Sequence, residues 1–190
     1  MITGIEIKRK MVHLATLIIP VGYGLTSDTT VLTFLFPFFL LYLSVDLLRH
    51  LHPGMASLFH KYFFGRVLRE EEKPRLMGST SFLFASILTI LFFPKSIAIV
   101  SMLILILSDT AAALIGKGFG RIRVFRKTFE GTLAFLVSSL LIVWIYPDLD
   151  RVLGSLAAIG TAAMEVLPIP LDDNLTIPLV AGAIMFFGMG

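Results

Sequence analysis

The sequence predicts an all-α integral membrane protein with about seven transmembrane helices, or six if one apolar segment does not cross. Two observations support this prediction. Of the 190 residues, 56% are hydrophobic and only 15% are charged, whereas a soluble domain needs more polar residues to cover its surface. Apolar segments also recur along the whole chain, as they do in polytopic membrane proteins.

Seven apolar segments can be distinguished. They lie at roughly 11–26, 31–48, 80–93, 96–115, 131–146, 152–168 and 175–189. Several are shorter than the roughly 20 residues that cross a bilayer unaided, which is why six crossings remain the alternative. The first segment has the basic flank of a signal peptide but no small-residue cleavage site, so we expect a retained helix. We expect one membrane-embedded domain over residues 1–190.

Two shorter features lie between the second and third apolar segments. An apolar stripe that includes Phe59 and Phe63 predicts a short amphipathic helix over 53–65, lying in the lipid interface. Ser79 is the expected N-cap of the helix that follows.

The basic residues predict the orientation of the chain. If the N-terminus is inside, the inner segments are 1–10, 49–79, 116–130 and 169–174. These segments hold 14 of the 16 lysines and arginines, and only Lys95 and Arg151 fall outside. The positive-inside rule therefore predicts an N-in, C-out topology. Topology also accounts for the sequence pI near 9.3, so we expect no nucleic-acid binding.

Most acidic residues fall on the same inner side, which topology alone does not require. Ten of the 13 aspartates and glutamates lie at or near the inner surface, although acids contribute little to orientation. A functional site on one side of the membrane explains this better. At the N-terminus, Glu6, Arg9, Lys10 and His13 recur at the spacing of one helical face, and we take them as candidates for that site.

The stretch from Leu107 to Thr132 combines an acid, glycines and cations. Asp109 stands near the end of an apolar helix, where a carboxylate is costly and is a functional candidate by default. The glycines and cations that follow are Gly116, Lys117, Gly118, Gly120, Arg121, Arg123, Arg126 and Lys127. They are similar to a phosphate loop without matching a Walker A motif. Thr128 or Thr132 is the expected cap of the next helix, whose first N–H groups favour an anion. The alternative is a basic loop that only sets topology.

The last inner turn gathers oxygen ligands. Glu165 lies near the inner end of the sixth segment, and Asp172, Asp173 and Asn174 precede the seventh. Such ligands suit Mg²⁺ held jointly by protein and substrate phosphates. A helix N-cap needs only one of the three residues, so we expect a second role for the others. Because the chain has no cysteine, thiolate ligands and a cysteine nucleophile are excluded.

These motifs together resemble the CTP-dependent lipid-alcohol kinases, which include dolichol kinase, phytol kinase and the yeast-type diacylglycerol kinase, and which are distantly related to phosphatidate cytidylyltransferases. The matching elements spread over nearly the whole chain in family order. They are Glu6…Arg9-Lys10…His13, Asp109…Ala112…Gly116-Lys117…Gly120, Lys127-Thr128…Glu130-Gly131-Thr132, and Glu165 with Asp172-Asp173-Asn174-Leu175…Pro178.

The resemblance implies transfer of the γ-phosphoryl group of CTP, with Mg²⁺, to the primary hydroxyl of a membrane lipid alcohol at the cytoplasmic face. The acceptor would be a polyprenol or dolichol, a phytol-like alcohol or a diacylglycerol, in a prokaryotic cell membrane or an endomembrane. The expected catalytic residues are Asp109, Asp173, Glu130 and His13. The expected metal ligands are Asp109, Asp172 and Asp173. The expected contacts to CTP are Arg9, Lys10, Gly116, Lys117, Gly120, Arg121, Lys127, Thr128 and Asn174.

Two other functions compete with a kinase. A cytidylyltransferase would make a CDP-activated lipid, but the late signature of that branch, a basic residue with His-Gly-Gly followed by Asp-Arg, is not found in the sequence. A small transporter would place its polar residues at the bilayer midplane rather than on one side. The distribution of charges therefore favours an enzyme.

Overall fold

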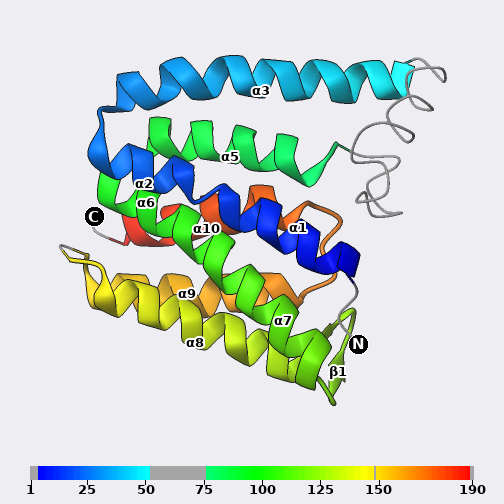
Figure 1. Cartoon of the computed structure of the whole chain (residues 1–190). Coiled ribbons are helices and arrows are strands. Elements are labelled where there is room, and N and C mark those ends of the chain that lie inside the picture. The colour runs from blue at the N-terminus through cyan, green and yellow to red at the C-terminus, as the bar shows by residue number, and fades with distance from the viewer. Residues whose placement is uncertain (1–3, 52–75, 148, 189–190) are drawn as a thin grey trace.

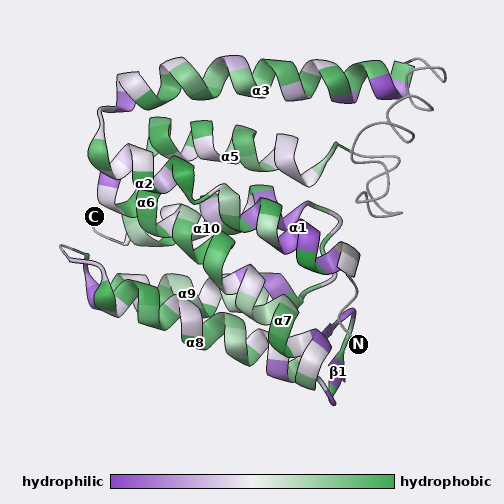
Figure 2. Cartoon of the chain, in the orientation of Figure 1, coloured by the Kyte–Doolittle hydropathy of each residue, from purple (hydrophilic) through white to green (hydrophobic). Residues whose placement is uncertain are grey.

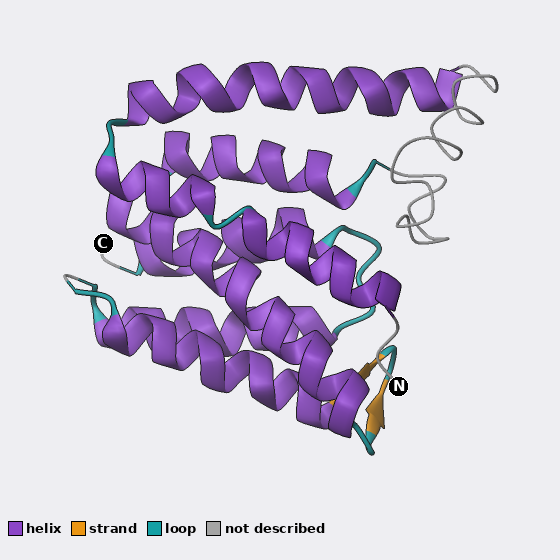
Figure 3. Cartoon of the chain, in the orientation of Figure 1, coloured by secondary structure: helices purple, strands orange, loops and turns teal. Residues whose placement is uncertain are grey.

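The computed structural model describes residues 4–51, 76–147 and 149–188, and almost all of them are helical (Figures 1 and 3). In chain order the elements are α1 (Gly4–Ala15), α2 (Ile18–Leu25), α3 (Asp28–Leu51), α5 (Gly78–Phe92), α6 (Lys95–Leu103), the π-helical turn η3 (Ile104–Ser108), α7 (Asp109–Phe119), β1 (Arg123–Val124), β2 (Lys127–Thr128), α8 (Phe129–Ile145), α9 (Arg151–Val166) and α10 (Asp173–Phe187). The strands β1 and β2 pair as a small antiparallel hairpin. The prediction of an all-α fold is confirmed.

The helices pack against one another around a buried apolar core. Helix α7 packs on α8, α8 on α9, α9 on α10 and α10 on α5, while α3 covers the outer side of α5 (Figure 1). Helix α6 lies against α2 and α10. Phe82, Ile104, Phe135 and Ile177 belong to the core cluster, and none is more than 2% exposed.

Successive helical runs of the described chain travel in alternating directions between two ends of the molecule (Figure 1). We call one the hairpin end; it holds the start of α1, the β1–β2 hairpin and the turn 167–172. The opposite end holds the turns 26–27 and 93–94, the end of α8 and the start of α9. Hydrophilic residues gather on α1, on the end of α7 and on the hairpin, whereas the helices between the two ends are mostly apolar (Figure 2).

The first apolar segment is not one helix, as predicted, but two. Helix α1 ends at Ala15 and α2 begins at Ile18. Pro20 has no N–H to donate, and in a continuous helix its ring would clash with the carbonyl of Thr16. The backbone N–H and the hydroxyl of Thr16 both donate to the carbonyl of His13, the hydroxyl at 2.5 Å. The turn separates the charged α1 from the apolar α2.

The helix predicted over 96–115 is longer than expected. It continues without interruption from Lys95 to Phe119 through α6, η3 and α7. Residues 116–119 are therefore helical, so the prediction of a glycine loop over 116–120 is wrong for these residues.

The start of α5 is capped from another helix. Ser79 makes no capping hydrogen bond, contrary to the prediction. Instead Asp46 of α3, which is fully buried, accepts hydrogen bonds from the backbone N–H of Met77 at 2.9 Å and the hydroxyl of Thr80 at 2.6 Å. Arg49 pairs with the other carboxylate oxygen at 2.9 Å, which compensates the buried charge. The amphipathic helix predicted over 53–65 lies outside the described residues.

Two helical runs of the described chain are long and apolar enough to cross a membrane. They are Asp28–Leu51 and Lys95–Phe119. Three further apolar helices, Gly78–Phe92, Phe129–Ile145 and Asp173–Phe187, are shorter. Helix α3 is notable because only 11% of its most apolar window is buried, so its side chains present a broad apolar surface to the outside.

Candidate functional site

Helix α1 turns its charged residues inward and its apolar residues outward. Glu6 and Lys10 are each only 7% exposed, whereas Ile7, Met11 and Val12 are about half exposed or more. A helix on the surface of a water-soluble protein shows the opposite distribution. The charged face must therefore be stabilised by partners inside the molecule.

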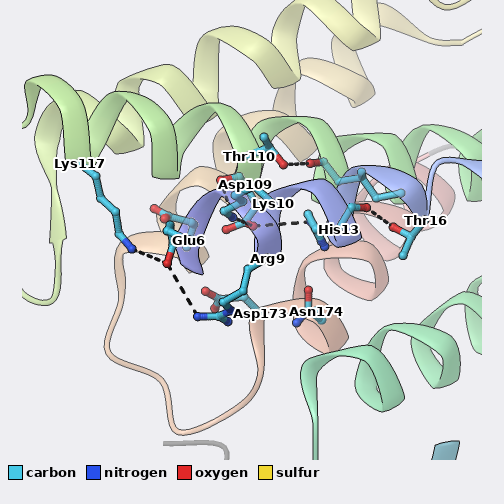
Figure 4. A network of polar contacts seen from close by, with 12 residues as sticks. Glu6, Arg9, Lys10, His13, Thr16, Asp109, Thr110, Lys117, Asp173 and Asn174 are labelled. Carbon is cyan, nitrogen blue, oxygen red and sulfur yellow. Dashed lines mark hydrogen bonds and ion pairs between the residues drawn. The ribbon is translucent and has the colours of Figure 1, made fainter. Parts of the chain in front are cut away.

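The partner of Lys10 is Asp109, the first residue of α7. The Lys10 ammonium donates to Asp109 Oδ2 at 2.5 Å and to its backbone carbonyl at 3.3 Å. His13 Nε2 lies 3.6 Å from the same carboxylate oxygen (Figure 4). Asp109 follows directly on the π-helical turn η3, and such turns are frequent at functional sites. The hydroxyl of Ser139 in α8 donates to Ser108 at 2.9 Å, which ties the end of this turn to the neighbouring helix.

A second charged group surrounds Lys127, the first residue of β2. Its ammonium donates to Glu165 at the end of α9 at 2.7 Å and to Asp173 at the start of α10 at 3.0 Å. Glu165 is 3% exposed, and its second oxygen accepts a hydrogen bond from Thr132 at 3.2 Å. Burial works against the charged amine, but the carboxylates of Asp173 and Glu165 outweigh it and hold the pKa of Lys127 above its usual value. Lys127 is therefore a fixed cation at neutral pH.

The two charged groups form one cluster. Asp109 interacts electrostatically with Lys127, and Asp173 is close enough to Asp109 for their carboxylates to repel. The cluster joins α1, the start of α7, β2 and the start of α10, which are far apart in the sequence. We call Lys10, Asp109, Lys127 and Asp173 the central cluster.

A looser set of charges surrounds the central cluster. Lys117, near the end of α7, reaches back to Glu6 of α1 at 2.8 Å, and its side chain is 48% exposed. Arg9 Nη1 lies 3.9 Å from the same Glu6 oxygen (Figure 4). Two predicted phosphate-binding cations, Arg9 and Lys117, thus lie at the border of the site and meet at one carboxylate.

The predicted glycines serve the contact between α7 and α8. A Cβ on Gly120 would lie 2.2 Å from the Gly116 carbonyl oxygen, and a Cβ on Gly131 would lie 2.9 Å from the Ala112 carbonyl oxygen. A Cβ on Gly116 would lie 2.8 Å from the Thr128 hydroxyl. That hydroxyl accepts the N–H of Gly131 at 3.2 Å and caps α8, which confirms one of the two predicted caps. Small residues here let the two helices approach closely.

Glu130 supports the hairpin rather than pointing into the central cluster. Its Oε1 accepts the backbone N–H groups of Arg121 at 2.9 Å and Ile122 at 3.3 Å. Arg121 and Glu130 therefore lie together on the hairpin. The catalytic role expected for Glu130 and the nucleotide contact expected for Arg121 stay predictions.

Comparisons with known proteins decide the family. The chain is 32% identical over 184 residues to an uncharacterized protein, RP860, of Rickettsia prowazekii, covering 92% of this chain and 90% of that protein. It is 28% identical over 163 residues to CTP-dependent diacylglycerol kinase 1 of Schizosaccharomyces pombe, covering 76% of this chain and 74% of that protein. It is 31% identical over 102 residues to phytol kinase of Synechocystis sp., covering 48% and 44%. The chain belongs to the family of CTP-dependent lipid-alcohol kinases. No family model matches the chain, and no solved structure gives a significant match.

In the turn before α10, the adjacent acids Asp172 and Asp173 make different contacts. Asp172 is the N-cap of α10, and its carboxylate accepts the N–H of Asn174 at 2.9 Å. Asp173 contacts Lys127. The expectation that one of the three residues caps the helix is confirmed, and the second role expected for the others stays a prediction.

The carboxylates fit a magnesium ion that is shared with a substrate. No group of three or more histidine, aspartate or glutamate side chains among the described residues is arranged to hold a metal by itself. Mg²⁺ at nucleotide sites, however, is commonly held by one or two carboxylates together with substrate phosphates and water. Asp109 and Asp173 supply two carboxylates whose mutual repulsion a cation would relieve. Asp172, whose carboxylate is occupied as a helix cap, fits less well.

The structure assigns contacts that the sequence pattern did not reveal. Glu165 was quoted in the family resemblance without a role and Thr132 only as an alternative helix cap. The buried carboxylate of Glu165 accepts hydrogen bonds from both Lys127 and Thr132. The signal in the sequence was a lone acid near the end of an apolar helix, as for Asp109. Asp46 gave the same signal but supports the packing of α3 on α5.

Proposed function

We propose that this protein is a membrane-embedded kinase that transfers the γ-phosphoryl group of CTP to the primary hydroxyl of a membrane lipid alcohol. The observation that supports this best is the central cluster. Two lysines and two aspartates from four distant segments meet at one end of a largely apolar helical body. A triphosphate with a divalent cation matches this combination of charges, whereas a purely apolar substrate does not.

The lysines neutralise the donor. Phosphoryl transfer depends mainly on positioning and on neutralising charge. Lys127 stands on the hairpin between α7 and α8, so it can hold the phosphates from one side, while Lys10 holds them from α1. Arg9, Lys117 and Arg121 line the approach from the cytoplasm. Because Lys10 and Lys117 are paired with Asp109 and Glu6 in the structure, binding of the donor exchanges these carboxylates for phosphate oxygens.

Asp109 and Asp173 would hold Mg²⁺. A bound ion would neutralise part of the phosphate charge, and the cationic side chains of the protein would neutralise the rest. The carboxylate of Asp109 keeps its position because it begins α7 and lies 3.6 Å from His13. Asp173 is held by Lys127.

The acceptor approaches along α1. The outward face of α1 exposes Ile7, Met11 and Val12, which suits the apolar tail of a lipid beside the site. The lipid oxygen attacks the γ-phosphorus, and the bond from that phosphorus to the β–γ bridging oxygen breaks to release CDP. We assign the proton of the hydroxyl to a neutral His13, whose Nε2 lies 3.6 Å from the carboxylate of Asp109.

The proposal includes a membrane that the helices cross about seven times with the N-terminus in the cytoplasm. The broad apolar surface of α3 is unfavourable in water and favourable in lipid. The alternating directions of the helical runs, together with the placement of basic residues at the hairpin end, support an orientation with that end in the cytoplasm. The whole chain then acts as a single membrane-embedded catalytic domain.

A label-transfer assay tests the proposal. The purified protein is incubated with Mg²⁺ and CTP labelled on either the α- or the γ-phosphorus, with diacylglycerol, phytol and a polyprenol as separate acceptors. We expect label on a lipid from γ-labelled CTP only, with release of CDP. ATP in place of CTP measures the nucleotide preference.

Two results would contradict the kinase. Label on the lipid from α-labelled CTP, with release of pyrophosphate, would show a cytidylyltransferase. Absence of labelled lipid with every acceptor, together with uptake of a solute by proteoliposomes, would show a transporter.

A further inference from the structure

The β1–β2 hairpin carries exposed apolar side chains at the hairpin end of the molecule. Phe119, Ile122 and Phe125 are 71%, 59% and 64% exposed, and Phe129 is 53% exposed. Phe119 ends α7 and Phe129 begins α8, where exposed apolar residues are expected in a membrane protein, but Ile122 and Phe125 lie between the helices, where a cytoplasmic polar turn has no such need. The four residues lie within eleven positions of the chain, and we call them the hairpin patch.

The turn of the hairpin places a bulky residue in an unfavourable backbone conformation. Arg123 pairs with Thr128 and Val124 with Lys127, so Phe125 and Arg126 form a two-residue turn. Phe125 has a φ of 52°, and among the described residues no other non-glycine residue has a positive φ. This position in a tight hairpin favours glycine or asparagine. Strain of this kind is retained where the side chain itself has a role.

The hairpin is held firmly, so its exposed side chains are presented in a fixed direction. Glu130 accepts the N–H groups of Arg121 and Ile122, and the N–H of Phe129 donates to the Ile122 carbonyl at 2.9 Å. The base of the hairpin is thereby attached to the first turn of α8.

Arginines surround the hairpin patch. Arg121, Arg123 and Arg126 alternate with Ile122, Val124 and Phe125 along the chain. In the described part of the chain, no carboxylate lies within ion-pair distance of Arg121 or Arg123, and both are exposed. Arg121 lies beside the Glu130 carboxylate, so Arg123 is the exposed cation on which we rely. The surface therefore combines apolar groups with an exposed positive charge.

We propose that the hairpin patch binds the anionic phospholipid headgroups of the cytoplasmic leaflet, with Phe125 and Ile122 in the interface and Arg123 on lipid phosphates. Charge complementarity supports this occupant, because arginines beside exposed aromatic residues are the features of interfacial anchors. Continuity supports it as well. Phe129 begins a row of exposed residues along one face of α8, with Leu133, Val137 and Leu141 at intervals of four, and this row would face lipid.

The anchor would fix the height of the site above the membrane. Lys127 and the α8 cap Thr128 belong to the same hairpin as Phe125. Docking of the patch on the interface therefore holds Lys127 at the level where a lipid hydroxyl emerges. This inference rests on the proposed membrane embedding and not on the identity of the phosphoryl donor.

Fluorescence of a tryptophan at the turn tests the proposal. The full chain carries Phe125→Trp on a Trp144→Phe background, because Trp144 is the single natural tryptophan. It is reconstituted in vesicles of phosphatidylcholine alone or mixed with phosphatidylglycerol. We expect blue-shifted emission, quenched by lipids brominated near the headgroup and protected from aqueous iodide, with a larger inserted fraction when phosphatidylglycerol is present.

Substitution of one arginine measures how much a single positive charge contributes to insertion of the hairpin patch. Arg123→Gln lowers the ratio of inserted to water-exposed emission in phosphatidylglycerol vesicles about fivefold, the equivalent of about 1 kcal/mol for one basic residue at an anionic surface. The matched control is Arg151→Gln at the opposite end, which leaves the ratio unchanged. Phe125→Gly relieves the backbone strain and is expected to fold and to retain turnover in detergent micelles, while turnover in vesicles loses its dependence on phosphatidylglycerol.

Four outcomes would overturn the proposal. One is water-exposed emission that iodide quenches fully in both lipids. The second is emission that responds to CTP but not to phosphatidylglycerol, which would assign the arginines to the nucleotide. The third is a blue shift that disappears when the protein is diluted in the membrane, which would assign the patch to a second copy of the chain. The fourth is turnover of Phe125→Gly in vesicles that depends on phosphatidylglycerol as the parent's does. In each case the label-transfer result would stand unchanged, so failure of the anchor and failure of the kinase are distinguishable.

Discussion

The two ends of the helical body use their charged residues in different ways. At the opposite end, Asp150 caps α9 by accepting the N–H groups of Val152 and Leu153, and Arg151 stacks over Trp144 at 5.3 Å. At the hairpin end, the ion pairs join residues that are 99, 46 and 38 positions apart. Asp150 thus finishes its own helix, and Lys95 at the same end reaches the distant Thr26 only through a backbone carbonyl. The three ion pairs at the hairpin end instead join oppositely charged side chains of distant segments.

This difference identifies the site without reference to any relative. A charge that only caps a helix or sets topology is satisfied by neighbours in the sequence or by water. Lys10 and Glu165 are buried and paired with residues of other helices, which costs desolvation that such simple roles do not require. Pairs of substitutions, one at each end, test the difference.

The largest effect is expected from removing the Asp109 carboxylate from the central cluster. Asp109→Asn lowers kcat by at least about a thousandfold, because the amide neither holds a cation nor neutralises Lys10 and His13. Asp150→Asn at the opposite end leaves kcat unchanged, since asparagine also caps helices well. Steady-state kinetics with thermal unfolding of both variants provide the measurement. Full activity of a folded Asp109→Asn protein would remove Asp109 from the mechanism.

The next effect concerns the lysine on the hairpin. Lys127→Met lowers kcat about a hundredfold by removing a fixed cation from the phosphates. It also lowers the free energy of unfolding by about 1–3 kcal/mol, because Glu165 is left buried without its ion-pair partner. The loss is no larger because one-third of the lysine side chain is exposed, so that solvent already weakens the pair. Adding Glu165→Gln should restore stability but not activity. Lys95→Met, which only removes a hydrogen bond to Thr26 at the opposite end, should keep its activity; equal losses in the two lysine variants would contradict the assignment.

A smaller effect is expected from tightening helix contacts. Gly131→Ala brings a methyl group to 2.9 Å from the Ala112 carbonyl oxygen and lowers the free energy of unfolding by about 1–3 kcal/mol. Gly154→Ala at the opposite end brings one to 2.4 Å from the side chain of Val143 and costs a similar amount. Only Gly131→Ala should also reduce kcat, by several-fold, because α7 carries Asp109. Denaturant titration and kinetics of both proteins measure this; a loss of activity in both would show that it follows stability rather than position.

The smallest effect concerns the border of the site. Glu6→Gln frees Lys117 from its ion pair, and we expect the KM for CTP to fall about twofold to threefold, as suits a partly exposed pair worth less than about 1 kcal/mol. Arg151→Gln should leave the KM unchanged. An increase in the KM of Glu6→Gln would mean that Glu6 helps to bind the nucleotide.

Local patterns in the sequence predicted the parts that neighbouring residues decide. The i, i+4 and i+7 spacing from Glu6 placed Lys10 and His13 on one face, and their contacts confirm it. The caps Thr128 and Asp172 were each among two or three candidates predicted from the sequence, because capping uses N–H groups two or three residues away. The all-α class followed from composition.

The remaining features depend on contacts between distant segments. The glycines at 116 and 120 look like a loop in sequence, but Gly116 lies within α7 and Gly120 ends it, where both pack closely on Thr128 before α8. Asp46 caps α5 from α3 across 31 positions, so no local signal pointed to it. In the sequence, Lys127 is one of five similar cations. It is distinguished only in the structure, where the packing of α9 and α10 places Glu165 and Asp173 beside it.

Hydrogen–deuterium exchange of the full chain in lipid nanodiscs, with and without Mg²⁺ and CTP, tests the central claim most directly. The claim is that distant segments at the hairpin end form one donor site. We expect the donor to protect peptides covering 6–13, 109–117, 127–132 and 165–174 together, and to leave those covering 23–30, 93–97 and 149–154 unchanged. Protection confined to one of the four segments, or equal protection at both ends, would contradict it.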